Sequence, residues 1–116
     1  MKINYSYDKD VDSLFIYLDE DYNYDESIEL TPNIIMDFDV NSYPVAVEIL
    51  SASILFKIDK ESFDNIENIV VHIEIDEDII KLTVILTIIN NDDLIINSKC
   101  INDFKAPIFN TELAIV

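Results

Sequence analysis

Apolar and polar residues alternate most regularly between Ile34 and Ser53. Two alternating runs, Ile34–Asp39 and Val45–Ile49, flank a break at Val40–Pro44 that carries asparagine, serine and proline. Because successive side chains of a strand point to opposite faces, each run predicts a strand with one apolar face, and the break predicts the turn of a β-hairpin. The carboxylates expected on the outward face of this hairpin belong to Asp37, Asp39 and Glu48.

The same alternation predicts two more hairpins. The first joins Lys2–Tyr7 to Leu14–Leu18 through a turn at Asp8–Asp12. The second joins Ile69–Ile75 to Ile80–Ile88 and is the longest in the chain. The residues predicted to be core, because each lies in the unbroken apolar register of its strand, include Val47, Val84 and Leu86.

Shorter elements are predicted elsewhere in the chain. Asp59 is expected to cap a helix of barely two turns that ends at Ile66. Short strands are predicted at Leu94–Asn97 and Leu113–Val116. Pro107 argues against a central strand in the last segment, because proline has no N–H to donate to a neighbouring strand.

Together these elements predict a mainly β fold, an antiparallel meander or sandwich-like sheet packing of roughly seven to nine strands with one short helix. The 116 residues are expected to form a single domain, 1–116, which can bury on the order of two thirds of its unfolded surface. We expect a β half at residues 2–53 and a β-hairpin extension at residues 54–116. Their apolar faces would pack on each other or across a homodimer.

Charge is the most extreme property of the chain. It has 24 acidic residues against 7 lysines and no arginine, which gives a formal net charge of −17. Such a surface repels phosphates and anionic lipid headgroups, so we expect no direct binding to nucleic acid or to an acidic membrane. The expected partner is a basic protein or a cation.

Residue types that are rare or absent restrict the chemistry further. Glycine is absent, which excludes phosphate-cradling loops and leaves asparagine and aspartate as the expected residues wherever a turn needs positive φ. Cys100 is the single cysteine and cannot form an internal disulfide, and the N-terminus lacks the apolar core of a signal peptide. We therefore expect a cytoplasmic protein. The apolar run Ile79–Ile89 is too short for a spanning helix, which needs ~20 residues.

The acidic residues of Asp8–Asp12, together with Asp19, match the spacing of a calcium-binding loop. However, Ser13 stands where such a loop needs glycine, and Leu14–Leu18 has a strand pattern where the loop should curl round the ion. A solvated acidic turn is therefore favoured over weak calcium binding. No metal site and no cofactor are predicted.

His72 and Cys100 are the side chains to consider for catalysis. His72, the only histidine, lies two residues from Glu74, which could orient its imidazole for acid–base work. With no second histidine and no cysteine near it in the sequence, a cross-strand partner is the favoured role. Cys100 has Lys99 as its single adjacent activating charge and is expected to be a small, half-buried residue. We predict no catalytic residue.

The stretch from Asp19 to Glu29 carries only acidic charges. Such a run is usually a solvated loop; the alternative is a recognition face on which tyrosines anchor and carboxylates steer a basic partner. With the outward carboxylates of the hairpin, the candidate partner-binding residues are Asp19, Glu20, Asp21, Tyr22, Tyr24, Asp25, Glu26, Glu29, Asp37, Asp39 and Glu48.

Four segments of the first half form one pattern: K-I-N-Y-S-Y-D at Lys2–Asp8, D-S-L-F-I-Y-L at Asp12–Leu18, I-I-M-D-F-D at Ile34–Asp39 and V-A-V-E-I-L-S-A-S at Val45–Ser53. In order and spacing, residues 2–53 resemble the small uncharacterised prokaryotic family catalogued as domain of unknown function 2283. Asn33 and Ala46 depart from it, since they stand where such domains tend to carry glycine. The resemblance brings no catalytic motif and implies a short β-rich fold and an antitoxin-like or accessory role.

These features predict a non-enzymatic acidic interaction protein that binds a basic protein partner. It would act either as an antitoxin-like protein or as a nucleic-acid-mimicking inhibitor of a nucleic-acid-binding protein. Two alternatives stay open: a small carboxylate- or metal-dependent enzyme, and a structural subunit of a homo-oligomer.

Overall fold

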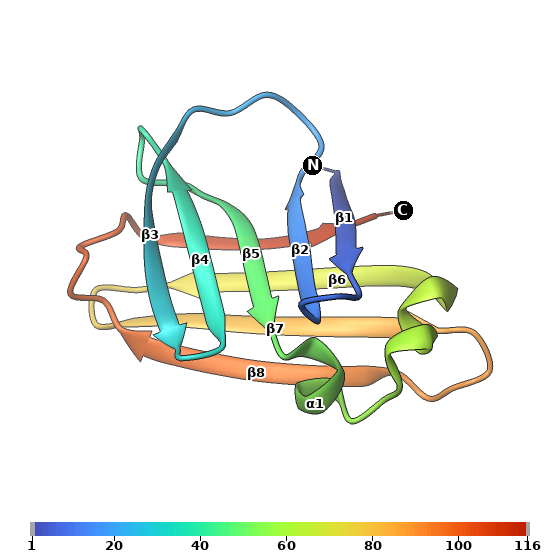
Figure 1. The fold of residues 1–116 in the computed structure, drawn as a ribbon. Coiled ribbons are helices and arrows are strands. Elements are labelled where there is room, and N and C mark those ends of the chain that lie inside the picture. The colour runs from blue at the N-terminus through green and yellow to red at the C-terminus, as the bar shows by residue number, and fades with distance from the viewer. Residues whose placement is uncertain (1, 116) are drawn as a thin grey trace.

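The computed structural model describes residues 2–115 as two packed β-sheets with two short helical segments (Figure 1). The strands of this described part are β1 (Ile3–Asp8), β2 (Ser13–Leu18), β3 (Tyr24–Thr31), β4 (Ile34–Asp39), β5 (Pro44–Leu50), β6 (Ile66–Ile75), β7 (Ile79–Ile88), β8 (Leu94–Ile101) and β9 (Phe109–Ala114). The helical segments are α1 (Ala52–Phe56) and a 3₁₀ helix, η1 (Lys60–Asn65).

The two sheets divide the chain by sequence. The first half forms a five-stranded sheet in the order β1-β2-β5-β4-β3, and the second half forms a four-stranded sheet in the order β8-β7-β6-β9. Strands of the first sheet run across those of the second in Figure 1, so the layers cross rather than align. The fold is therefore an antiparallel sandwich in which β3-β4-β5 and β6-β7-β8 are meanders, while β5 also pairs with β2.

The apolar faces of both sheets meet in one hydrophobic core. Val47, Val84 and Leu86 are all buried there, as predicted. Phe38 packs against Phe104 with ring centroids 4.7 Å apart, so the segment after β8 covers one end of the core. The predicted packing of two apolar faces on each other is confirmed within a single chain.

The three predicted hairpins are confirmed by the strand registers. Pairs that define them are Ile3 with Leu18, Ile34 with Ile49, and Ile75 with Ile80. The register of each hairpin places its alternating apolar residues on the inner face. Local alternation was a sufficient signal because burial of one face repeats every second residue.

Other elements differ from the expected ones in extent. The acidic run is not simply a loop, since its second part forms the edge strand β3. β8 continues beyond Asn97 to Ile101, and β9 occupies Phe109–Ala114. Val116, the predicted end of the last strand, lies outside the described residues. β9 begins after Pro107 and is an edge strand, in agreement with the restriction that proline imposes.

Two helical segments stand where one was expected. Asp59 precedes η1, but its side chain makes no capping hydrogen bond, and Ile66 belongs to β6 instead of the helix. α1 begins within the last two residues of the family-like segment, at Ala52. No helix of the described part is long and apolar enough to cross a membrane.

Positive backbone φ is not confined to asparagine and aspartate, so that expectation is wrong. Within residues 2–115, the residues with positive φ are Asp12, Ser42, Ser51, Lys57, Asn90 and Lys105. Lys57 shows why other residue types are tolerated, because its backbone N–H donates to the carbonyl of Ile54 and closes the end of α1. A local cost of about 1–2 kcal/mol is offset by such hydrogen bonds and by the surrounding packing.

Candidate partner-binding face

The outward face of the five-stranded sheet carries aromatic side chains beside its carboxylates. One cross-strand row contains, in spatial order, Ser6, Phe15, Glu48, Ile35 and Glu29. Glu48 and Glu29 therefore stand on either side of Ile35. Their backbones are about 10 Å apart, because neighbouring strands are spaced by nearly half that distance.

A second row lies two residues further along each strand. In spatial order it contains Asn4, Tyr17, Ala46, Asp37 and Ser27. The rings of Phe15 and Tyr17 connect the two rows, with centroids 5.2 Å apart and planes inclined by 24°. We call the surface formed by Phe15, Tyr17, Glu29, Asp37 and Glu48 the acidic–aromatic face.

Hydrogen bonds hold two of these carboxylates in place. Ser27 Oγ donates to Asp37 Oδ1 at 2.6 Å, and the hydroxyls of Ser27 and Tyr24 lie 2.7 Å apart. Ser13 Oγ donates to Glu48 Oε2 at 3.0 Å. Each carboxylate has one oxygen engaged by these bonds, which fixes its orientation on the face.

Tyr22 extends the face from the loop between β2 and β3. Burial raises the pKa of its hydroxyl, and the charges of Asp37 and Tyr17 raise it further. Tyr22 is half-buried and packs against the hydrophobic core. The predicted tyrosine anchor is therefore held in place by the core beneath the loop.

The remaining predicted residues surround this face unevenly. Asp19, Glu20 and Asp21 are exposed in the loop after β2, while the exposed residues of β3 include Tyr24, Asp25, Glu26 and Glu29. Asp39 has a local role, because its Oδ1 accepts hydrogen bonds from the backbone N–H groups of Asn41 and Tyr43. The structure thus brings Glu29, Asp37 and Glu48 together on one face, with the loop that carries Tyr22 and the edge strand as an acidic border.

Phe15 and Tyr17 are the members of this face that sequence reasoning missed. They occupy the outward positions of β2, between the core residues Leu14, Ile16 and Leu18. Aromatic residues at alternate positions on the expected polar face of a strand were the available signal. Which carboxylates surround them depends on the insertion of β5 beside β2, which is a long-range pairing.

His72 has cross-strand partners, which is the role that the sequence favours over catalysis. It lies opposite Thr83 on β7 and Glu112 on β9, and its Nε2 is 2.8 Å from Asn110 Oδ1. Cys100 is half-buried, as expected, and burial followed by the charge of Asp103 raises the pKa of its thiol. A raised pKa leaves less thiolate at neutral pH and therefore disfavours nucleophilic reactivity.

The calcium-loop spacing does not translate into a loop. Asp8 lies at the end of β1, and its Oδ1 accepts a hydrogen bond from the backbone N–H of Asp10. β2 then runs straight from Ser13 to Leu18, which moves Asp19 about 20 Å along the sheet. Residues 2–115 contain no group of three or more histidine, cysteine, aspartate or glutamate side chains placed to hold a metal ion.

Asp12 joins three parts of the family-like segment. Its carboxylate accepts hydrogen bonds from the Tyr7 hydroxyl at 2.6 Å, the Ser53 hydroxyl at 2.7 Å and the Ser53 backbone N–H at 3.0 Å. Burial raises the pKa of Asp12, but these bonds and the charge of Lys60 outweigh it and leave the pKa lowered. Burial, followed by the bond to Asp12 and nearby acidic charge, holds the Tyr7 pKa far above its ordinary value. The cluster caps α1 and is structural.

Comparison with known proteins agrees with the division of the chain into a first and a second sheet. Residues 4–53, which span β1 to β5, match the family described as "Protein of unknown function (DUF2283)". A protein of Methanosarcina mazei named "Putative hypoxanthine phosphoribosyltransferase" is 33% identical over 107 residues, covering 90% of this chain and 85% of that one. No solved structure matches the chain.

The fold and the matched segment define a small two-sheet β protein whose first sheet is the DUF2283 segment. The chain belongs to the same family as the Methanosarcina mazei protein, because the similarity covers nearly all of both chains. The expected resemblance of the first half is confirmed. The similarity to the relative also extends beyond residue 53, where sequence patterns alone had shown none.

Proposed function

We propose that this protein is a non-enzymatic interaction protein whose acidic–aromatic face binds a basic protein partner, as an antitoxin binds a toxin. The observation that carries the proposal is the stacked pair Phe15 and Tyr17 on β2, which lies beside Glu48 of β5 and on the same outward face as Asp37 of β4. Aromatic rings beside oriented carboxylates suit the side chains of arginine and lysine.

Long-range attraction supports the first step of binding. The chain has a net charge of −17, and the exposed acids of β3 and the preceding loop border the acidic–aromatic face. Charges of one sign at the rim of a surface raise the rate of encounter with an oppositely charged partner. The acidic border would therefore steer the basic partner towards the protein, while the acidic–aromatic face would contact it.

Short-range chemistry favours arginine over lysine in the partner. A guanidinium group stacks on an aromatic ring and donates two parallel hydrogen bonds to a carboxylate, whereas an ammonium group does neither as well. Glu48 and Asp37 each have one oxygen already held by a serine hydroxyl, which orients the other for a donor. We propose a cytoplasmic partner that presents arginine.

The geometry supports a protein-binding face better than mimicry of a nucleic acid. A phosphate mimic would use regularly spaced carboxylates along one strand, as Asp37 and Asp39 offer in the sequence. Asp39 instead closes its turn through Asn41 and Tyr43. An irregular group of carboxylates on one side of a pair of aromatic rings fits individual basic side chains.

Transferase activity is the second candidate, because the Methanosarcina mazei relative carries that name. A phosphoribosyltransferase must hold phosphate groups, which a chain of net charge −17 without glycine or arginine is poorly composed to do. We therefore rank it below partner binding. Incubation of the purified protein with hypoxanthine and a phosphoribosyl donor tests it directly, and formation of the nucleotide would put this candidate first.

Fluorescent peptides of matched length, rich in arginine, in lysine or in glutamate, are suitable probes for the binding proposal. The arginine peptide should bind most tightly and the glutamate peptide should not bind. Tyr17→Leu should reduce the preference for arginine over lysine, because it removes one of the stacked rings. Equal affinity for both basic peptides in the parent protein would contradict the proposed face.

A matched pair of charge variants separates local from overall charge. Replacing Asp21, Asp25 and Glu26 by lysine should slow association and flatten its salt dependence. The control replaces Glu67, Glu77 and Asp103, which are exposed residues of the second half, and changes the net charge by the same amount. Equal slowing by both variants would show that binding depends on net charge and involves no particular face. A partner recovered by pull-down with the full chain then replaces the peptides.

A further inference from the structure

β8 is an open edge of the four-stranded sheet. It pairs with β7 on one side, and within residues 2–115 no strand pairs with its other side. The second layer of the sandwich approaches β8 through β3 and α1. The inward side chains of β8 are only partly buried, whereas those of β7 are fully buried, so the edge is accessible to a further strand.

The other three edge strands carry features that prevent pairing with another chain. β3 has exposed acids and two register irregularities against β4, and β9 carries Glu112. β1 and β9 meet through a bridge between Lys2 and Ala114. β8, Leu94–Ile101, has no acidic residue and exposes Ile95 by 60% and Ile101 by 72%. A long, unpaired edge strand that lacks acidic residues and exposes isoleucine side chains can be a template for strand addition.

We propose that β8 pairs antiparallel with β8 of a second copy, so that the two four-stranded sheets form one continuous sheet across a two-fold axis at Ser98. This register places Ile95 opposite Ile101 of the second copy and Asn97 opposite Lys99 of the second copy. Ser98 lies opposite Ser98 of the second copy. The interface is self-complementary, as a two-fold dimer requires.

The cross-strand rows of apolar and polar side chains on the outward face favour this register. On the outward face, Ala114, Val70, Ile85 and Ile95 form one apolar row across four strands. In the dimer this row continues into Ile101 of the second copy and then into the residue paired with it, Ile79 of the second copy. The neighbouring polar row, which ends at Asn97, likewise continues into a polar row.

Sliding the register by two residues breaks this match in either direction. One shift places Ile95 opposite Lys99 of the second copy. The other places the two Lys99 side chains opposite each other, and like charges directly opposite are destabilising. Shifts by one residue would put outward side chains against inward ones.

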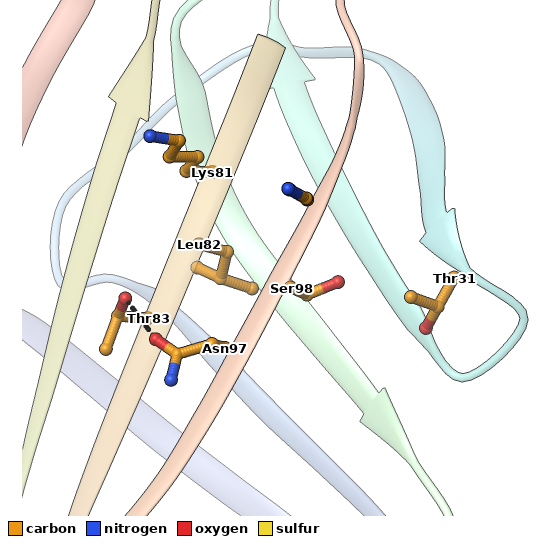
Figure 2. Close-up of a pocket in the computed structure, with 7 residues that line it drawn as sticks. Thr31, Lys81, Leu82, Thr83, Asn97 and Ser98 are labelled. Atoms are coloured by element: carbon orange, nitrogen blue, oxygen red, sulfur yellow. Dashed lines mark hydrogen bonds between the residues drawn. The ribbon is translucent and has the colours of Figure 1, made fainter.

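Ser98 supplies a second, independent observation. Its Oγ is shielded from solvent and has no hydrogen-bond partner among residues 2–115. It points towards Thr31 across a hollow of about 470 Å³, while Thr83 and Asn97 are bonded to each other on the other face of the strands (Figure 2). In the proposed register, the two Ser98 hydroxyls can hydrogen-bond across the axis, which satisfies both groups.

Charge distribution makes this edge the natural place for two acidic chains to meet. β7 and β8 contain no acidic residue and carry Lys81 and Lys99, which lie opposite each other. The two copies therefore approach through their least acidic surface. Because the rest of each chain repels the other, added sodium chloride should tighten the dimer.

Disulfide cross-linking tests the register. In a Cys100→Ser background, Ser98→Cys places two thiols opposite each other at a separation that a disulfide can span. Asn97→Cys in the same background is the control, because its copies lie diagonally, about 7–8 Å apart, beyond that range. Diamide oxidation should yield a covalent dimer at position 98 and little at 97. Failure at position 98, or equal cross-linking at both positions, would overturn the register.

A charge-swap cycle measured by sedimentation equilibrium tests the contact. Ile95→Glu alone and Ile101→Lys alone should each weaken the dimer by about tenfold or more, because each disrupts the apolar pair at two symmetric places. The combined variant should recover much of the affinity, since each introduced glutamate opposes an introduced lysine. Both positions are exposed, so the monomer fold is kept. A parent chain that stays monomeric, or a combined variant no better than the single ones, would overturn the proposal.

Discussion

The hydroxyl of Tyr7 donates a 2.6 Å hydrogen bond to Oδ1 of Asp12, five residues along the chain. Asp12 has a φ of 54°, in the left-handed region, and its carboxylate also accepts two hydrogen bonds from Ser53. The ring of Tyr7 stacks on Phe63 at 4.2 Å. This pair therefore connects the first hairpin, the start of α1 and η1, and joins the family-like half to the second half of the chain.

Removal of this hydroxyl should destabilise the protein. Tyr7→Phe is expected to lower the free energy of unfolding by about 1.5–3 kcal/mol, because a hydrogen bond to a charged group is lost. Tyr5→Phe is the matched control on the same strand, since the Tyr5 hydroxyl makes no hydrogen bond within the described residues, and it should change stability by less than about 0.5 kcal/mol. Urea unfolding at neutral pH measures both. Equal effects would show that the Tyr7–Asp12 bond contributes nothing specific.

Acidification should remove the contribution of Asp12. The pKa of Asp12 is lowered in the folded state, so its stabilising effect is fully present above the ordinary aspartate pKa of about 3.9 and is lost as pH falls through the lowered value. Asp12→Asn should therefore be less stable than the parent at neutral pH, and the difference should shrink at low pH. Urea unfolding at several pH values measures the difference in free energy of unfolding between the parent and the variant. A difference that stays constant with pH would contradict the prediction.

A charge in the core should unfold the sandwich. Val47 is 2% exposed on the central strand β5, and burial of an unpaired carboxylate costs several kcal/mol. Val47→Asp should thus consume much or all of a domain stability of ~5–15 kcal/mol. Glu48→Asp, one residue along on the outward face, is the control and should fold normally. Cooperative melting of the Val47 variant within a few degrees of the parent would be incompatible with the observed burial.

Sodium chloride should stabilise the fold. Within residues 2–115, the only ion pair joins Lys9 to Asp64 at 3.3 Å, and both side chains are largely exposed. Most of the acidic side chains that produce the net charge of −17 therefore have no ion-pair partner. The Debye screening length of their mutual repulsion falls from about 10 Å at 0.1 M salt to about 3 Å at 1 M. The melting temperature should rise over this range. The Glu67, Glu77 and Asp103 to lysine variant should show a smaller rise, and a flat curve for the parent would refute the role of repulsion.

Local alternation in the sequence was enough to determine the hairpins, the inward face of each strand and the core positions such as Val47 and Val84. The physical reason is that a strand with one buried face must repeat its apolar residues with a period of two, and a slip by one residue would expose them all. Composition likewise determined the charge of the surface. None of these properties depends on how the hairpins are arranged relative to one another in the sheets.

Strand order was decided only by the tertiary structure. The acidic run did not reveal that Tyr24–Thr31 is an edge strand, because exposed acidic residues suit both a loop and an edge. Positive φ at Ser51 and Lys57 also depends on context, since Asp12 and the end of α1 supply the hydrogen bonds that hold the backbone there.

The candidate partner-binding face likewise combines features that the sequence determines with features that only the tertiary structure decides. Sequence alone determined that Asp37 and Glu48 point outward, because each alternates with buried neighbours. Only the pairing of β5 with both β2 and β4 decided that the Phe15–Tyr17 stack shares a surface with them, next to Glu48 and one strand away from Asp37. That pairing brings together segments about 30 residues apart, and its free energy comes from burial of the whole sheet against the second layer, which no local pattern encodes.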